Sequence, residues 1–292
     1  LELVQRLCAF LNAGVTPVVH ELGSIGASGD LVPLTYVAGA ITGHDASFVV
    51  DAGGSRMPSS AALMLLGLAP LSLEPKEALA LVNGTSASAA IAAGVVHDAR
   101  RLLALAIGTH MLAAQALRAR TEAFDPFIHA HKPHRGQRWA ARQAYALLHG
   151  SRLTRRDEAD AGEPPQDRYS LRCLPQFLGP IADTIADVAR DITVEINSTT
   201  DNPVVDVEGG RFLHGGNFLA QYVATGMDRL RAAISLLVGH LDVQLAQLVT
   251  PAFSGGLPAS LAGDSAQPGA MGLKGLQLTA NSIAPLVAFD GQ

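Results

Sequence analysis

Apolar residues that recur at helical spacing constrain the fold of this sequence more than any other feature. Ile181, Ile185, Val188, Ile192 and Ile196 are three or four residues apart, which indicates one amphipathic helix. The Ala-rich stretch 86–118 and the stretch 217–249 are longer helical patterns, the first with an expected break near Gly108. Their length predicts a mainly α fold, a long helical bundle with glycine-rich loops and a few short β-hairpins.

Shorter elements complete the prediction. Helices are expected over 1–12 and 31–41 and from about Pro75, and hairpins over 48–54 and 204–213. The first helix should bury the face formed by Val4, Leu7, Cys8 and Leu11, and the last long helix a face that includes Tyr222, Leu230, Leu237 and Leu248. We expect two domains, 1–107 and 108–292.

Composition argues against several classes of protein. A net charge of −5 and an aromatic content of 5% speak against a nucleic-acid surface. Two cysteines make no disulfide framework, so a reducing cytoplasm is the expected location. The apolar stretch 61–73 is too short to span a bilayer, and we expect no membrane association. Because the sequence starts at Leu1 inside a helical pattern, we expect it to be a piece of a longer protein.

Ala27-Ser28-Gly29 could supply unusual chemistry. The Gly29 nitrogen can attack the Ala27 carbonyl and close an imidazolone ring, and loss of the Ser28 hydroxyl then leaves an exocyclic methylidene, a strong electrophile. Glycine and alanine suit the tight backbone approach that this needs. A flexible Gly/Ser loop is the simpler alternative. A phosphate-binding loop is disfavoured, since the glycine spacing matches neither common motif and no lysine follows.

Other polar segments could complete a site. Tyr169 and Arg172 share a face if their segment is helical, and an arginine fork suits a substrate carboxylate; an ion pair of Arg172 with Asp167 is the alternative. Asn83 and the pair Asn217-Phe218 lie in loops beside helices, where capping and turn roles also fit.

The segment His129-x-His131-x-x-His134 invites a metal-site interpretation. Lys132 and Arg135 would repel a cation there, and Asp125 is the one carboxylate nearby. We therefore expect no metal site.

Seven stretches carry a family resemblance: GSIGASGDLVPLTYVAG (23–39), EPKEALALVNGTS (74–86), FDPFIHAHKPHRGQ (124–137), QDRYSLRCLPQ (166–176), EINSTTDNP (195–203), HGGNF (214–218) and GLKGLQLTANSIAPL (272–286). Together, and in this order, they resemble the aromatic amino-acid ammonia-lyases and related aminomutases. The segments QDRYSLRC, EINSTTDNP and GLKGLQLTANSI look most like bacterial phenylalanine ammonia-lyases.

The resemblance implies a role for each matching residue. Ala27, Ser28 and Gly29 would form the methylidene-imidazolone group (MIO) autocatalytically, with no external cofactor. Asn83 would support that group and the substrate amine, and Tyr169 would lie near the departing ammonia. The substrate would be bound by Arg172, Asn217, Phe218, Lys274 and Gln277, with Arg172 and Asn217 at its carboxylate and Phe218 packed beside MIO.

The implied reaction is elimination of ammonia from an aromatic L-amino acid, phenylalanine favoured over tyrosine and histidine, in a homotetramer with shared active sites. The family's β-proton base is a tyrosine on a loop well before the Ala-Ser-Gly segment, and no tyrosine here matches it. We therefore expect these residues alone to be weakly active or inactive. An aromatic aminomutase and a non-catalytic helical scaffold remain the alternatives.

Overall fold

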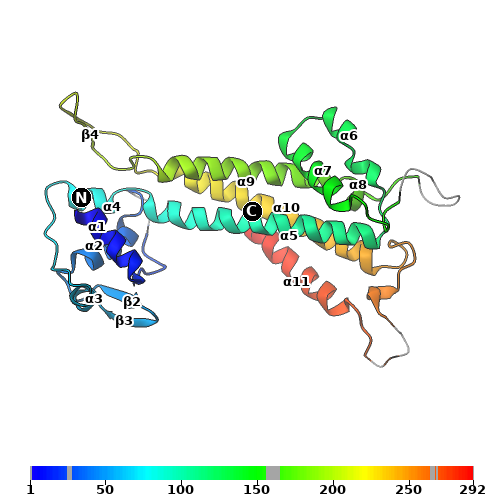
Figure 1. The fold of residues 1–292 in the computed structure, drawn as a ribbon, viewed down its shortest axis with the longest axis horizontal. Helices are drawn as coiled ribbons and strands as arrows, with labels where there is room; N and C mark the ends of the chain where they lie inside the picture. The colour runs from blue at the N-terminus through cyan, green and yellow to red at the C-terminus, as the bar shows by residue number, and fades with distance from the viewer. Residues whose placement is uncertain (1, 25–27, 156–164, 264–266, 268, 292) are drawn as a thin grey trace. The chain divides into compact units, whose positions relative to one another are not determined.

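The computed structural model describes residues 2–24, 28–155, 165–263, 267 and 269–291. Most of these residues are helical, which confirms the predicted mainly α class (Figure 1). The α-helices are α1 (Glu2–Asn12), α2 (Leu31–Thr42), α3 (Ser59–Leu65), α4 (Glu77–Val82), α5 (Ser86–Ala116), α6 (Pro126–Ala130), α7 (Arg135–Leu148), α8 (Tyr169–Arg172), α9 (Leu174–Ile196), α10 (Gln221–Val249) and α11 (Lys274–Asp290). The strands are β1 (Val15–Pro17), β2 (Val49–Ala52), β3 (Ser55–Pro58), β4 (Val204–Asp206) and β5 (Arg211–Leu213), and short 3₁₀ helices cover Thr121–Phe124 and Ala259–Leu261.

The chain forms two compact units. Unit 1 consists of Leu1–Ala93 and Ile192–Ala224, and unit 2 of Gly94–Asp191 and Thr225–Gln292. Each unit therefore combines two separate stretches of sequence, because the long helices pass from one unit to the other. A domain boundary at 107/108 stays a prediction.

Unit 1 holds a small antiparallel sheet in the order β1-β2-β3, packed with α1, α2 and α3. Both predicted hairpins are present, β2-β3 and β4-β5. The sequence gives little sign of β1, which has only three residues and ends in a proline. Phe10, Ile41, Val50 and Leu63 are at the centre of the apolar core.

Of the predicted inner face of α1, Leu7 packs against the core but the other three residues do not. Val4 and Leu11 are 58% and 79% exposed and Cys8 is exposed, whereas Arg6 and Phe10 are buried. Arg6 turns inward because its Nη1 donates to the carbonyl oxygens of Ala69 at 2.6 Å and Ile41 at 3.3 Å. Because these carbonyl oxygens accept hydrogen bonds from the guanidinium, a charged side chain can be buried here. Apolar spacing alone does not predict such a residue on the inner face of a helix.

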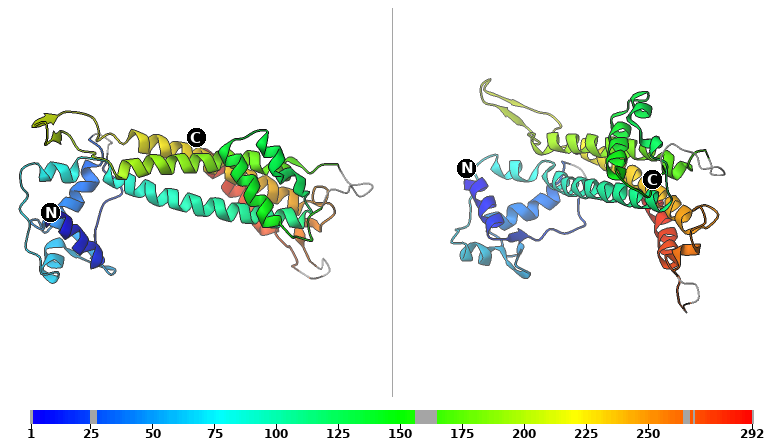
Figure 2. Two further views of the ribbon diagram at one scale, coloured as in Figure 1. Left: turned by 45° about the horizontal axis from the view of Figure 1, so that its top comes forward. Right: turned by 45° about the vertical axis from the view of Figure 1, so that its right-hand side comes forward.

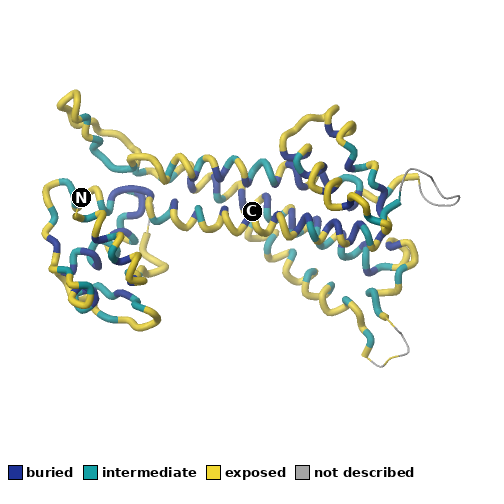
Figure 3. Tube along the Cα trace, in the orientation of Figure 1, coloured by how far each residue is buried: buried dark blue, intermediate teal, exposed yellow. Residues whose placement is uncertain are grey.

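Unit 2 is a helical bundle in which α5, α9 and α10 run side by side (Figure 2). Their facing sides carry the buried residues (Figure 3), among them Leu103, Ile185 and Leu237. The expected break near Gly108 is wrong, because α5 is continuous from Ser86 to Ala116. The buried residues Ile107 and Met111 hold that turn in helical form despite the low helix propensity of glycine.

Two other helices begin later than predicted. Helix α4 starts at Glu77 because Lys76 has a φ of 78°, in the left-handed region. Helix α10 starts at Gln221, so that Asn217 and Phe218 lie in the turn before it. Tyr222 is 71% exposed, contrary to its predicted inward position, because it lies near this helix start, whereas Leu230 and Leu237 are buried as predicted.

One described helix, α10, is long and apolar enough to cross a membrane by length and composition. The apolar stretch 61–73, which is too short to span a bilayer, is not part of this helix. Helix α10 also buries His240, Gln244 and Gln247 within the bundle. Only 33% of its apolar window is buried, and Leu236 and Val243 are exposed.

Helix α11 differs from the rest of the bundle because none of its described residues is buried. Leu276, Leu286 and Phe289 are 54%, 65% and 76% exposed. Figure 3 shows intermediate or exposed residues along its whole length.

Candidate functional site

The backbone around Gly29 is closely packed. Ser28 and Gly29 have φ angles of 57° and 68°, and Gly29 forms a β-bridge with Gly84. A Cβ atom on Gly29 would lie 2.1 Å from the Gly84 carbonyl oxygen and 2.6 Å from that of Phe218. Only glycine fits this left-handed, enclosed position. Ala27 lies outside the described residues.

Asp30 anchors the residues that follow this segment. Its amide donates to the Gly84 carbonyl at 2.8 Å. Its carboxylate accepts the Ser88 amide at 2.7 Å and the Ser88 hydroxyl at 2.5 Å. It thereby satisfies an amide in the first turn of α5. Sequence reasoning assigned no role to Asp30, although its position directly after Gly29 was a usable signal.

Asn83 is buried beside an ion pair. Its Nδ2 donates to Asp201 Oδ1 at 2.9 Å, and Lys76 Nζ lies 2.5 Å from Asp201 Oδ2. Burial alone would raise the pKa of Asp201, but the hydrogen bonds from Lys76 and Asn83 outweigh it and hold that pKa below its usual value. Asp201 therefore orients the Asn83 amide. Lys76 and Asp201 both fall in stretches of the family resemblance, which was the one signal for them.

Asn217 and Phe218 lie in the turn before α10. Asn217 Nδ2 donates to the Thr199 carbonyl at 3.1 Å, and the Phe218 carbonyl faces Gly29. Unit 1 thus brings together three polar loops that are distant in sequence, at 28–30, 83–85 and 217–218.

Tyr169 and Arg172 begin and end the short helix α8 in unit 2. They share a face as predicted, with the Arg172 guanidinium carbon 4.6 Å from the centre of the Tyr169 ring. Both line a cavity of about 630 Å³, together with Asp242, Val243 and Gln247. The Arg172 Nε atom is buried and, among the described residues, has no hydrogen-bond partner. Arg172 thus brings a cationic group to this cavity, which is also lined by Asp242.

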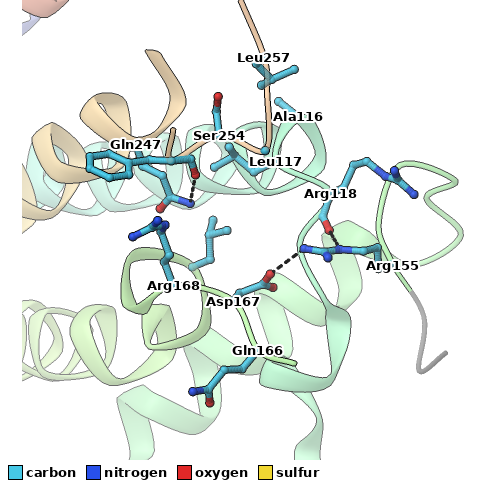
Figure 4. Close-up of a pocket in the computed structure, with 13 residues that line it drawn as sticks. Ala116, Leu117, Arg118, Arg155, Gln166, Asp167, Arg168, Gln247, Ser254 and Leu257 are labelled. Atoms are coloured by element: carbon cyan, nitrogen blue, oxygen red, sulfur yellow. Dashed lines mark hydrogen bonds and ion pairs between the residues drawn. The ribbon is translucent and has the colours of Figure 1, made fainter. Parts of the chain in front are cut away.

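The alternative ion pair between Arg172 and Asp167 is not formed. Asp167 instead pairs with Arg155 at 3.0 Å and accepts the Arg120 amide at 2.6 Å. Figure 4 shows this pair among the residues that line a neighbouring cavity of about 460 Å³. The two cavities share Gln166, Asp167, Arg168, Gln247 and Phe253. The Arg168 guanidinium stacks on Phe253, with 4.6 Å from its carbon to the ring centre.

A network of buried polar side chains hydrogen-bonds to Ser170 of α8. The Ser170 hydroxyl donates to Gln247 Oε1, and Gln244 Nε2 donates to the Ser170 carbonyl at 3.5 Å. Gln244 Oε1 lies 2.5 Å from His110 Nδ1, and His110 Nε2 lies 3.3 Å from His240 Nδ1. Burial lowers the pKa of His110 to about 4 and also lowers that of His240. The sequence did not predict this network, because its members are polar residues from three distant segments.

Lys274 and Gln277 lie in the first turn of α11. Lys274 Nζ is 3.2 Å from Gln277 Oε1, in an exposed pair. They belong to unit 2, as do Tyr169 and Arg172, whereas Ser28, Gly29, Asn83, Asn217 and Phe218 belong to unit 1.

The histidine segment has a structural role. His129 is buried, with Nε2 3.0 Å from the Ala123 carbonyl and Nδ1 3.0 Å from Gln137 Nε2. His131 hydrogen-bonds to the Phe127 carbonyl at 2.8 Å. Among the described residues, no group of three His, Cys, Asp or Glu side chains could hold a metal ion.

Known proteins resemble this chain in sequence. A phenylalanine ammonia-lyase of Nostoc punctiforme is 55% identical over 296 residues, covering 100% of this chain and 52% of the relative. The chain thus spans about half the length of the curated relatives it matches.

Solved structures agree with the sequence comparison. The phenylalanine ammonia-lyase of the yeast Rhodosporidium toruloides superposes with a TM-score of 0.93 at 36% identity, over 99% of this chain and 44% of that one. A tyrosine aminomutase from Streptomyces globisporus gives 0.89 at 32% identity, over 98% and 56%. The family model for aromatic amino acid lyases matches residues 1–289. The chain belongs to the aromatic amino acid lyase family.

Proposed function

We propose that this chain is the part of an aromatic amino-acid ammonia-lyase that forms the electrophile and binds the substrate carboxylate. The favoured substrate is L-phenylalanine, which would give trans-cinnamate and ammonia. The proposal draws on the 55% identity to a phenylalanine ammonia-lyase and on the packing of the Gly29 segment.

The enclosure of Gly29 carries the proposal. A Cβ atom there would overlap two carbonyl oxygens, so the chain leaves room only for a small, tightly turned backbone. This enclosure would favour the tight turn that ring closure by Ala27-Ser28-Gly29 requires. When formed, MIO supplies an electrophile that turns the substrate amine into a better leaving group. Asn83, fixed by Asp201, would hold a polar group beside it.

The remaining residues bind and orient the substrate. Arg172, whose buried Nε has no partner among the residues that the structure describes, would pair with the substrate carboxylate in bidentate geometry. Tyr169 on the same face would accept a hydrogen bond from the departing ammonia or give it a proton. In the net reaction the β-carbon–hydrogen and α-carbon–nitrogen bonds break, a carbon–carbon double bond forms, and ammonia leaves. Asn217, Phe218, Lys274 and Gln277 are proposed to border the substrate.

The mass of the peptide that spans residues 27–29 tests this function. Formation of MIO predicts a deficit of two water molecules relative to the sequence. The matched control is the same peptide from Ser28→Ala, which cannot lose the serine hydroxyl. An unmodified mass in the full-length protein would contradict the proposal.

An aminomutase is the second candidate, favoured by the likeness to the Streptomyces globisporus enzyme. It would return ammonia to the β-carbon of the same intermediate product. Chromatography of the reaction with phenylalanine separates the two functions, because a lyase accumulates cinnamate whereas a mutase accumulates a β-amino acid.

We further propose that the enzyme is a cytoplasmic homotetramer with active sites shared between subunits. The exposed apolar residues of α11 favour an oligomer, since the described residues leave them uncovered. Sedimentation of the full-length protein as a monomer would contradict this.

A further inference from the structure

A second pocket in unit 2 lies apart from the candidate site. Helices α5, α7 and α9 enclose about 410 Å³, and no residue lines both this pocket and the cavity of Tyr169 and Arg172. Its lining combines Arg100, Arg135 and Arg142 with Trp139, Leu103 and Ile185. It therefore offers cationic groups, one aromatic ring and an apolar floor in a single hollow.

Close helix packing shapes this pocket. A Cβ atom on Gly136 of α7 would lie 2.0 Å from the Gly179 carbonyl of α9, and one on Gly179 would lie 2.6 Å from the Gln137 amide nitrogen. The two backbones thus touch at a pair of glycines. Trp139 follows Gly136 by three residues and shares its side of α7. The contact therefore holds the half-buried Trp139 beside α9.

Of the three arginines that line the pocket, only one forms ion pairs with the described residues. Arg135 is occupied, with Nε 2.9 Å from Asp183 Oδ1 and Nη2 2.9 Å from Asp187 Oδ1. The other Asp183 oxygen accepts the Gly136 amide at 3.0 Å. Arg100 and Arg142 form no ion pair within the described part of the chain and are exposed at the pocket. Two guanidinium groups are thus left for a ligand.

We propose that this pocket binds a small aromatic monocarboxylate, with its carboxylate on Arg100 and Arg142 and its ring against Trp139. An arginine fork suits a carboxylate, and an aromatic face suits a ring. Asp183 and Asp187 disfavour a polyphosphate, which carries more negative charge than the two free arginines can match. The proposed lyase would release acids of this class. Only this connection between the ligand of the pocket and the reaction product rests on the proposed function.

Tryptophan fluorescence tests the binding directly, because Trp139 is the only tryptophan of the 292 residues. The chain is titrated with hydrocinnamate, which does not absorb where tryptophan is selectively excited. We expect a saturable change in Trp139 emission. The double variant Arg100→Gln/Arg142→Gln should bind at least about tenfold more weakly. Arg138→Gln, an exposed arginine of α7 outside the pocket, is the matched control and should bind as the parent does.

Further variants separate this pocket from the candidate site. Ser28→Ala and Arg172→Gln should leave the fluorescence titration unchanged, so that failure of the lyase proposal and failure of this one are distinguishable. Equal binding of neutral hydrocinnamamide would overturn the proposal. The same emission change with inorganic phosphate alone would also overturn it, since it would assign the pocket to simple anions. Loss of the signal in Arg172→Gln would place the ligand in the other cavity and likewise contradict it.

Discussion

The Asp30 carboxylate accepts both the amide and the hydroxyl of Ser88, at 2.7 and 2.5 Å. The residue after Ala27-Ser28-Gly29 is thereby tied to the first turn of α5. This connection gives the segment proposed to cyclise a rigid support on one side.

Ser88→Ala removes the hydroxyl bond to Asp30 but keeps the amide bond. We expect the free energy of unfolding to fall by about 1 kcal/mol, the usual net value of one such bond. Urea unfolding followed by circular dichroism measures it. Ser86→Ala, at an exposed position in the same turn, is the control. Equal stability of the two variants would show that the hydroxyl bond contributes nothing.

Asp201→Asn should make the free energy of unfolding less dependent on pH in the acidic range. The pKa of folded Asp201 lies below its ordinary value of 3.8, so its stabilising effect is complete above that value and is lost as the pH falls through the folded pKa. The difference in unfolding free energy between parent and variant should therefore shrink between about pH 6 and about pH 3. Asp98→Asn, with its side chain 76% exposed, is the control.

His110→Gln should remove a destabilisation at mildly acidic pH. The pKa of His110 is about 4 in the fold against 6.5 normally, so the unfolded chain takes up the proton first. Stability from the neutral ring is present above pH 6.5 and is lost progressively toward pH 4, by up to roughly 3 kcal/mol. Chemical unfolding at about pH 7.5 and about pH 4.5 compares the variant with the parent. His97→Gln, exposed on the same helix, should keep the parent's pH dependence.

Arg172→Gln in the full-length enzyme should lower kcat/KM for phenylalanine by about a hundredfold, since the carboxylate loses its charged partner. Arg172→Lys should recover only part of this, because lysine cannot form the two-pronged contact. Initial rates of cinnamate formation measure both. Arg190→Gln, at a side chain 62% exposed, should keep parental rates. A change of less than about threefold in Arg172→Gln would remove Arg172 from carboxylate binding.

Gly136→Ala should destabilise unit 2 by about 1–3 kcal/mol, because its Cβ would overlap the Gly179 carbonyl. Relief of that overlap requires a shift of one helix backbone relative to the other. Gly108→Ala is the matched test on α5, where an added Cβ would have no described atom within 4 Å beyond its chain neighbours and its own helix backbone. That change should stabilise the chain by up to about 1 kcal/mol. Thermal unfolding of the two variants should therefore shift in opposite directions.

Apolar spacing predicted the elements whose stability depends on apolar burial. Helix α9 was found because its inward Ile and Val residues recur every three or four positions. The hairpin β2-β3 was found because a short apolar run is followed by Gly53-Gly54. Helix α1 was found but assigned a largely wrong face, because Arg6 is buried through carbonyl oxygens of distant residues. No local pattern contains that information.

In the candidate site, too, the sequence did not predict contacts between residues that are distant in the chain. The resemblance named the residues proposed for chemistry, and Tyr169 and Arg172 do share a face as their spacing suggests. Their supports were not predicted: Asp201 is 118 residues from Asn83, and Gln244 is 134 residues from His110. A hydrogen bond between such distant residues follows only from the assembled fold.

Helix α11 has a consequence for local unfolding. Because it buries none of its described residues, it gains little from tertiary packing, and its backbone hydrogen bonds are stabilised almost entirely by the helix itself. Its amides should therefore exchange with deuterium long before those of α9, through openings that leave the rest of unit 2 folded. In an assembly that covers Leu286 and Phe289, the same amides would become slow to exchange, so α11 would report subunit association residue by residue.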